Sequence, residues 1–507
     1  MLAVLISFLA PSRFEGIEAR HLLVFFKQLT AYGRECVTYV GEAGYFRSPA
    51  DHRLDGRPEW QQSWCETFEY EPPHDLEGVQ FRTVPDDLLA ARQSRLRSRW
   101  RVYGQLTTRR CAEVEAAFDG ALASIPNASD AEAVVTFANM PSLSRVAAKR
   151  RLPVVHTHFG PLRKPDYLMT GYWDRRGVNS RTDAARRFRA FRREVAGRGP
   201  TLLSCEELLH TLRRTAVPDG PDAADAPYAT GLALQGEENG YVHGLGALDL
   251  ISAAQERFRR DDILLRSHPG ALTRYSDALG VADTSASATD FILACRTVMT
   301  VSSGVAFEAM LLGRRCVVLG DSPFCIAADR SFGAADRRTH RDHLLALNFL
   351  AFGYLVPYAL MFDLEYTRWR LTDPPEVDIL RHHQRWYRER LTASPSSSLT
   401  LSTAAKLIES VSHGAPPQPL IVFGAGQATP SLVDRLRADR FELLGVFDND
   451  ETQWGRTLRG LPIGQPTYRD DALVLVSSLT YADAIVHQLA SLGFPPGRVL
   501  RLTQAAA

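Results

Sequence analysis

The chain has 507 residues, with 59 lysines and arginines against 58 aspartates and glutamates, so its formal net charge is +1. Hydrophobic residues make up 45% and charged residues 23%, an average globular composition that excludes general disorder. The near-neutral charge argues against a dedicated nucleic-acid binder, which normally carries a large basic excess. At roughly 150 residues per domain, the length predicts about three domains.

Cysteine usage indicates a reducing compartment. The seven cysteines are scattered and no C-x-x-C occurs, so neither a zinc knuckle nor a disulfide framework is indicated. Residues 1–10 are apolar but lack a basic start and a small-residue cleavage site, so we expect a buried strand there and no signal peptide. We therefore expect a cytoplasmic protein.

One segment raises the question of a membrane. Residues 344–362 contain no charge and are just long enough to span a bilayer. Asn348, Gly353 and Pro357 interrupt the segment, and its tyrosines do not form a belt at each end. We predict a buried helical pair or an interfacial patch, with peripheral association at the inner membrane as an open alternative.

The first half of the chain alternates strand-like and helix-like stretches. A helical pattern is clearest at 88–124, and apolar runs predict strands at 2–9, 133–138, 152–157 and 201–204. This alternation predicts an α/β fold with a doubly wound parallel sheet. A stretch rich in Pro, Asp and Gly follows at 217–227 and is typical of a linker.

A second alternating unit begins after this linker. A long helical region covers 340–392, and strands are predicted at 228–234, 262–267, 297–302 and 315–320. Two Rossmann-like units facing a cleft are the outline of a GT-B glycosyltransferase. We assign 1–220 to the acceptor-side unit and 221–392 to the nucleotide-sugar unit with its trailing helices.

A third, small Rossmann-like domain is predicted at 419–507, after a linker at 393–418. Gly424 and Gly426 follow a strand and open a helix, and Asp448 ends the next strand. This context matches the dinucleotide fingerprint, but Thr429 replaces its third glycine. The sequence therefore predicts a weak nucleotide site, and a scaffolding or partner-binding module stays open.

Polar residues follow three successive strands of the second unit. An acidic pair, Glu237–Glu238, follows the first strand, His268–Pro269 the next, and Ser302–Gly304 begins a helix after the third. Open α/β sheets bind ligands at such strand ends, and a helix N-terminus favours a phosphate. Read singly, these motifs also fit a solvated loop, a strand end and a helix cap.

The order of acidic turn, H-P and S-S resembles the motif set of bacterial glycosyltransferases that use CMP-activated sugars. Residues 297–324 (TVMTVSSGVAFEAMLLGRRCVVLGDSPF) are similar to the capsule and lipopolysaccharide β-Kdo transferases in particular. Residues 154–179 (VVHTHFGPLRKPDYLMTGYWDRRGVN) are similar to the N-terminal unit of that group. The resemblance covers about 150–330, and 1–150 only in outline.

The resemblance implies a donor site. His268 matches a histidine that binds the CMP phosphate, and Ser302 and Ser303 match hydroxyls that support it. Glu308 matches an acid that holds the ribose in GT-B enzymes.

The resemblance also implies an acceptor side. Gly160, Pro161 and Arg163 match a loop of the opposite unit that faces the cleft. Arg163, Arg175 and Arg176 are candidates to bind the sugar carboxylate or an anionic acceptor, since Arg pairs with carboxylates in a bidentate way. They also fit surface arginines of an Arg-biased proteome.

Two departures affect the catalytic residues. His158 stands where the family loop commonly has an acid, and Asn239 where a nucleophilic Asp is expected. Glu238 is then the next candidate, as a displaced nucleophile or as a general base, with Glu237 beside it.

We therefore expect a metal-independent glycosyltransferase without a cofactor. Its partners would be a nucleotide-sugar donor, with Kdo or a related 2-keto acid carried on CMP, and a surface polysaccharide or glycolipid acceptor, with no nucleic acid involved. A UDP- or GDP-sugar transferase and a non-catalytic polysaccharide-assembly protein stay open as alternatives.

Overall fold

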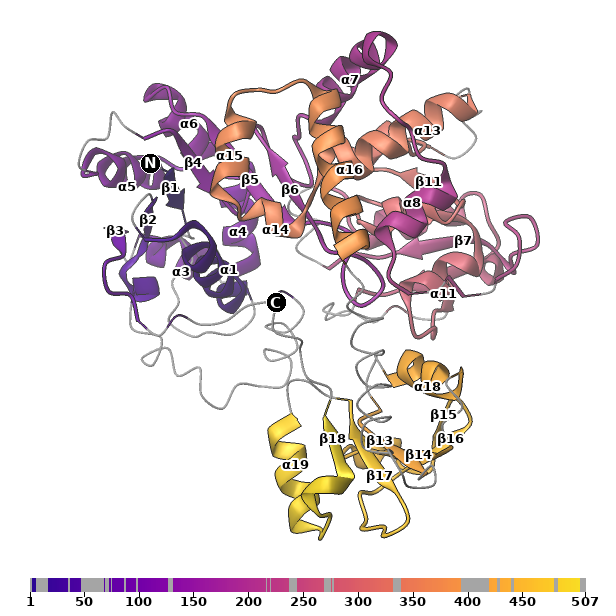
Figure 1. Cartoon of the computed structure of the whole chain (residues 1–507). Coiled ribbons are helices and arrows are strands. Elements are labelled where there is room, and N and C mark those ends of the chain that lie inside the picture. Colours follow the sequence, from indigo (N-terminus) through magenta and orange to yellow (C-terminus); the bar gives the residue numbers. More distant parts are fainter. Residues whose placement is uncertain are drawn as a thin grey trace. The chain divides into compact units, whose positions relative to one another are not determined.

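The computed structural model describes residues 2–5, 17–34, 37–46, 68, 73, 75–85, 88–96, 99–125, 131–215, 217–218, 220–236, 244–268, 275, 278–331, 339–393, 419–425, 429–438, 442–477 and 482–501. The chain divides into two compact units, Met1–Tyr387 and Arg388–Ala507 (Figure 1). The first unit holds two sheets and the second holds one, so the predicted α/β architecture is confirmed.

The first sheet has the strand order of a doubly wound fold. Five parallel strands lie in the order β3-β2-β1-β4-β5, namely Gln80–Val84, Val37–Glu42, Leu2–Leu5, Ala133–Thr136 and Val154–Phe159. Strand β6 (Thr170–Asp174) joins β5 in the antiparallel sense, and β12 (Leu355–Pro357) in turn joins β6. The helices of this part are α1 (Ile17–Tyr32), α3 (Ala90–Leu96), α4 (Arg99–Thr108), α5 (Ala112–Ala123), α6 (Pro141–Lys149), α7 (Ala184–Arg198) and α8 (Cys205–Leu212).

The stretch predicted to be helical at 88–124 is helical and forms three helices, α3, α4 and α5. One local prediction for this part was wrong. Residues 201–204 form no strand and lead into α8, where Ser204 caps the helix by accepting a hydrogen bond from the Glu207 amide. The backbone of Leu203 is instead bonded to a buried side chain, Asn348, which provides the pairing that a sheet would otherwise give.

The second sheet repeats the same strand order. All five strands are parallel in the order β9-β8-β7-β10-β11, namely Val281–Ala282, Ile263–Arg266, Tyr228–Ala233, Cys295–Thr300 and Arg315–Val318. Its helices are α10 (Ala247–Gln255), α11 (Ala288–Leu293) and α12 (Val305–Leu311). Both predicted Rossmann-like units are therefore present.

The uncharged segment 344–362 lies in the core. It covers the end of α13 (His340–Asn348), a π-helix (Phe349–Tyr354), the edge strand β12 and helix α14 (Tyr358–Met361). Nearly all of its side chains are buried, and the apolar ones from Leu345 to Leu355 pack with α7, α8, α12 and α16 (Glu376–Ala393) in the largest apolar cluster of the described residues. The segment begins beside helix α12 of the second sheet and then passes through β12 in the first sheet, which ties the two sheets together.

Polar side chains satisfy the backbone where this segment departs from a regular helix. The buried side chain of Asn348 bonds both backbone groups of Leu203, at 2.8 Å each. The carbonyl of Gly353 accepts a hydrogen bond from the buried Arg187 at 2.6 Å. In the described part of the chain, no helix is both long and apolar enough to cross a bilayer.

The C-terminal unit has the doubly wound order a third time. Its parallel strands lie in the order β16-β14-β13-β17-β18, with β15 (Thr457–Leu458) antiparallel at the edge beside β16. These strands are Leu461–Gly464, Leu443–Phe447, Leu420–Phe423, Leu473–Val476 and Val499–Arg501, and the helices are α18 (Thr429–Ala438) and α19 (Ala482–Ser491).

The first unit also contains helix α15 (Leu364–Leu371), between α14 and α16. Of the predicted linker 393–418, Ala393 ends α16, and residues 394–418 lie outside the described residues.

We expect Phe352→Ala to destabilise the first unit strongly, because Phe352 is fully buried and stacks edge-on against Tyr387. Removing a buried phenyl ring costs about 3–5 kcal/mol. Leu248→Ala is the control, since Leu248 is 60% exposed and its loss should cost less than about 0.5 kcal/mol. Urea denaturation measures both, and equal midpoints for the two variants would contradict the core assignment.

Candidate functional site

The strand order fixes where a ligand can bind. In the order 3-2-1-4-5, the connections after the first and fourth strands leave the sheet in opposite directions and open a crevice at their carboxyl ends. In the second sheet these strands are β7 and β10, which pair from Tyr228–Cys295 to Ala233–Thr300. The residues that follow them are 234–236 and 301–304, and these form the candidate site.

Gln235 joins the two strand ends. Its side-chain oxygen accepts a hydrogen bond from the Ser302 amide at 2.9 Å, and its side chain also lies 3.3 Å from the Ser302 hydroxyl. Ser302 is buried, so the structure places it as a support for the crevice floor. Sequence reasoning missed Gln235, although its position directly after the predicted strand and before the acidic pair was a usable signal.

Ser303 lies directly before Gly304, the N-cap of helix α12. Its hydroxyl accepts a hydrogen bond from the Val305 amide at 3.3 Å, and its own amide donates to the Thr300 hydroxyl at 3.2 Å. The sequence predicted free amide groups here, but the amides of Ser303 and Val305 already have these partners. The Ser303 hydroxyl keeps its own proton, so it can still donate to a phosphate oxygen.

The other two strand-end motifs of the second sheet are the acidic pair and the His–Pro motif, and most of their residues lie outside the described ranges. His268 is exposed and follows β8, which is the neighbour of β7 on the side away from β10. Two strand spacings of about 4.8 Å place the ends of β8 and β10 roughly 10 Å apart. Glu237, Glu238, Asn239 and Pro269 lie outside the described residues.

A loop of the first sheet closes one side of this crevice. A side-chain carbon on Gly304 would lie 2.5 Å from the Cβ of Pro161, so the two backbones meet here. Position 160 requires a glycine, because a Cβ there would lie 2.7 Å from the carbonyl carbon of the neighbouring Thr170. The structure therefore brings the predicted loop 160–161 to the predicted serine motif, with Gly160 acting in packing.

Two further residues of this loop region lie at the carboxyl end of β5. His158 is half-buried and its ring stacks on Phe137, with the ring centroids 4.8 Å apart. Arg163 is exposed, and its guanidinium carbon lies 5.9 Å from the centroid of the Phe68 ring. Both residues are therefore on the same sheet edge as Pro161.

Arg175 lies elsewhere. Strand β6 is antiparallel to β5, with Phe159 opposite Gly171 and His156 opposite Asp174. Arg175 follows β6 and so lies near the amino end of β5, where its guanidinium pairs with Asp373 at 3.2 Å. The structure therefore separates Arg175 from Arg163 and Gly160, which the sequence analysis had grouped, because β6 runs antiparallel to β5.

Glu308 is buried in a polar network behind the serine motif. Its carboxylate accepts a hydrogen bond from Thr289 at 3.3 Å, and Thr289 in turn accepts one from the buried Arg213 at 3.0 Å. Burial raises the pKa of Glu308 to about 7, against the opposing charge of Arg213. Arg213 also donates to the Tyr167 hydroxyl at 2.9 Å, so this network links both sheets.

The glycine turn of the C-terminal unit holds its acid tightly. Gly424 has a φ of +106°, and one oxygen of Asp448 accepts a hydrogen bond from the Ala425 amide at 2.5 Å. The other oxygen accepts one from the Asp450 amide at 2.8 Å. Both oxygens expected to face a ribose therefore already bind backbone, and Gly426 lies outside the described residues.

Within the described ranges, no three His, Cys, Asp or Glu side chains gather as a metal site would require. The described crevice offers the hydroxyl groups of Ser302 and Ser303 and the amide of Gln235. These groups suit a polar ligand such as a phosphate ester.

Comparison with known proteins gives one family match. Residues 7–183 match the family model described as the Glycosyltransferase 99 family N-terminal domain. No curated protein matches this chain.

Three of the solved structures that resemble the chain are the following. Thermosulfurimonas dismutans KpsC, as a beta Kdo 2,7 transferase, is 15% identical, with 49% of this chain and 86% of that chain covered and a TM-score of 0.32. The beta Kdo 2,4 transferase of the same organism's KpsC is 17% identical, with coverages of 44% and 80% and a TM-score of 0.30. SnogD from Streptomyces nogalater is 14% identical, with coverages of 77% and 95% and a TM-score of 0.22.

We expect Gly304→Ala to destabilise the first unit by about 1–3 kcal/mol, because the added methyl group would overlap Pro161. Gly120→Ala is the matched control in α5, where nothing lies within 4 Å of the added carbon. It should stabilise the protein by about 0.5–1 kcal/mol. Thermal unfolding compares the two, and a Gly304→Ala protein as stable as the wild type would contradict the loop contact.

The raised pKa of Glu308 predicts a pH dependence. Because folding favours the protonated form, this stabilising contribution is complete below pH 4.5 and is lost as pH rises through about 7. Glu308→Gln cannot ionise, so its stability relative to the wild type should increase by up to about 3 kcal/mol between pH 5 and pH 8. Denaturation at both pH values measures this difference. The exposed control Glu365→Gln should show no such change, and parallel curves for Glu308→Gln would refute the assignment.

Proposed function

We propose that this chain, a glycosyltransferase by its N-terminal family match, transfers Kdo or a related 2-keto sugar acid from a CMP donor. The acceptor is a bacterial surface polysaccharide or glycolipid. The observation that carries the proposal is the crevice between β7 and β10, where Gln235 fixes the serine motif opposite Pro161 of the other sheet. The sequence motifs that resemble β-Kdo transferases lie on both sides of that crevice.

In this proposal the crevice stabilises the departing nucleotide. When the bond between the anomeric carbon and the phosphate oxygen breaks, negative charge builds on the CMP phosphate. The Ser303 hydroxyl and the His268 ring donate hydrogen bonds to that charge, which lowers the barrier more than it lowers the ground state. Gln235 and Ser302 support this geometry through their mutual hydrogen bonds.

The acceptor side requires a base. As the oxygen of the acceptor hydroxyl bonds to the anomeric carbon, a carboxylate takes the proton of that hydroxyl. Glu238 is the candidate for this base, with Glu237 beside it. In a double displacement, Glu238 would instead attack the anomeric carbon first. No metal takes part in this scheme, since the phosphate charge is met by hydroxyl and imidazole groups.

We expect CMP to raise the unfolding temperature of the protein, whereas UDP and GDP do not. Ser303→Ala should weaken CMP binding roughly tenfold, because a hydrogen bond to a charged group contributes about 1.5–3 kcal/mol. Ser124→Ala is the control, since the Ser124 hydroxyl only donates to the Ala121 carbonyl at the end of α5. Stabilisation by UDP and not by CMP would refute the CMP donor and favour the UDP-sugar alternative.

A second experiment separates an enzyme from a binding protein. Glu238→Gln and His268→Ala should each lower the transfer of labelled sugar from the CMP donor by at least about 100-fold, the usual contribution of a positioned base. Their unfolding temperatures should stay near that of the wild type, because His268 is exposed. Normal polymer assembly in cells that carry both substitutions would favour the non-catalytic alternative.

A further inference from the structure

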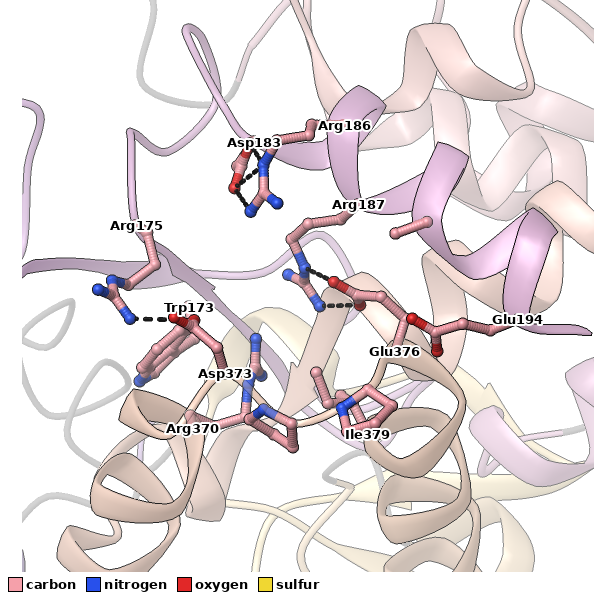
Figure 2. A pocket seen from close by; sticks show the side chains of 13 residues that line it. Trp173, Arg175, Asp183, Arg186, Arg187, Glu194, Arg370, Asp373, Glu376 and Ile379 are labelled. Atoms are coloured by element: carbon pink, nitrogen blue, oxygen red, sulfur yellow. Dashed lines mark hydrogen bonds and ion pairs between the residues drawn. The ribbon is translucent and has the colours of Figure 1, made fainter. Parts of the chain in front are cut away.

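A second polar pocket lies in the first unit, at the opposite end of the first sheet from the strand-end crevice. It has a volume of about 390 Å³ and is formed by the end of β6, the first turns of α7 and the residues between α15 and α16 (Figure 2). The residues that define its chemistry are Trp173, Arg175, Arg186, Arg187, Arg370 and Glu376.

The strand register gives the separation of the two sites. Gly160 directly follows β5 at the crevice end, whereas Arg175 follows β6 and continues its pairing past Asp174, opposite His156. About five residues of β5, at 3.3 Å each, therefore separate the two positions, or roughly 17 Å. A sugar bound at the pocket is not the one that reacts in the crevice.

Two guanidinium groups are buried in the pocket wall. Arg187 is 5% exposed, and its Nε and Nη2 donate to the two oxygens of Glu376 at 2.8 Å each. Its third nitrogen, Nη1, is buried and has no hydrogen-bond partner in the described part of the chain. A buried donor left unsatisfied costs about 1–3 kcal/mol, and here it leaves part of the Arg187 charge without a bonded partner in the described chain.

Arg370 adds a second buried positive charge. It is 3% exposed, and its guanidinium carbon lies 4.3 Å from the centroid of the Trp173 ring. Burial lowers the pKa of Arg370 from its ordinary value, and the nearby charge of Arg187 acts in the same direction. Figure 2 shows the side chains of Arg187 and Arg370 pointing toward one another. The described contacts give these two cations a single carboxylate in bonding distance, Glu376.

Carboxylates alternate with arginines around the rest of the pocket. Arg175 pairs with Asp373 at 3.2 Å, and the Nε of Arg186 donates to Asp183 at 2.7 Å. Four arginines and four carboxylates line the pocket in total, the last carboxylate being Glu194. Such a mixture does not suit a bare anion, which the carboxylates would repel. It suits a ligand that offers one carboxylate to the arginines and several hydroxyl groups to the carboxylates.

We propose that this pocket binds a carboxylate-bearing saccharide unit of the acceptor chain, at a distance from the reacting end. This inference rests on the proposed function and adds the acceptor's chemical class to it. Holding a remote acidic unit keeps the acceptor on the enzyme while its growing end occupies the crevice. The rim arginines Arg175 and Arg186 contact the ligand, and Arg187 with Arg370 supplies the positive charge behind them.

Glucuronate, glucose and inorganic phosphate are the probes, with binding followed by ligand-observed NMR titration on the full chain. We expect glucuronate to bind the wild type and to bind Arg175→Ala/Arg186→Ala at least tenfold more weakly. Arg189→Ala is the control, because Arg189 is an exposed arginine of the same helix that does not line the pocket. Glucose and phosphate should neither bind comparably nor displace glucuronate.

Several results would overturn this inference. These are undetectable glucuronate binding, equal binding to the wild type and the double variant, equal loss in the control, or binding of glucose or phosphate as tight as that of glucuronate. The rise in unfolding temperature with CMP distinguishes this inference from the proposed function, because the double variant should show the same rise as the wild type. If glucuronate does not bind but CMP still raises the unfolding temperature, only the pocket proposal is refuted. If CMP does not raise the unfolding temperature of the wild type, the proposed function is refuted.

Discussion

The buried passage of residues 345–362 through the first unit is the constraint on which the candidate site depends. This segment leaves helix α13, turns through a π-helix, forms strand β12 at the edge of the first sheet and ends in α14. Its apolar side chains from Leu345 to Leu355 share one core with α7, α8, α12 and α16. Because one continuous segment is packed against both sheets, the loop at Pro161 is held against the helix start at Gly304.

The departures of this segment from helical geometry place polar groups where the fold needs them. The π-helix leaves the Gly353 carbonyl free to accept from Arg187, whose other bonds reach Glu376 at the start of α16. Single-turn π-helices are frequent beside functional sites. Here the buried ion pair connects the segment to α7 and α16, so the core and the second pocket share the same residue, Arg187.

The sequence predicted the repeated α/β units and most of the strand ends, because buried parallel strands form apolar runs that are visible without a structure. It also placed His268, Ser302 and Ser303 after strands, but it missed the short strand β9 that lies between β8 and β10 in the chain. It missed Gln235, whose role depends on a side-chain contact across two strands, and the direction of β6, which only the pairing with β5 reveals. From the sequence alone, the uncharged segment 344–362 could be a core segment or a membrane segment. The buried Asn348 in it is bonded to the backbone of Leu203, 145 residues away, and such a distant partner is visible only in the structure.

The two ends of the first sheet have different chemistry. The carboxyl end of β5 carries the loop that meets the serine motif, with His158 and Arg163 beside it. The other end carries the pocket of alternating arginines and carboxylates. The antiparallel strand β6 connects the two ends directly. An acceptor that spans this distance would have one unit at each end, which requires a chain of several sugars.

We propose that the crevice between β7 and β10 holds the phosphate of a CMP-activated sugar. A crystal structure of the protein with bound CMP would test this. We expect the phosphate within hydrogen-bond distance of the Ser303 hydroxyl and the His268 ring, with Pro161 on the opposite wall. Density for CMP at Gly424 and Asp448, or none in the crevice at saturating concentration, would contradict it.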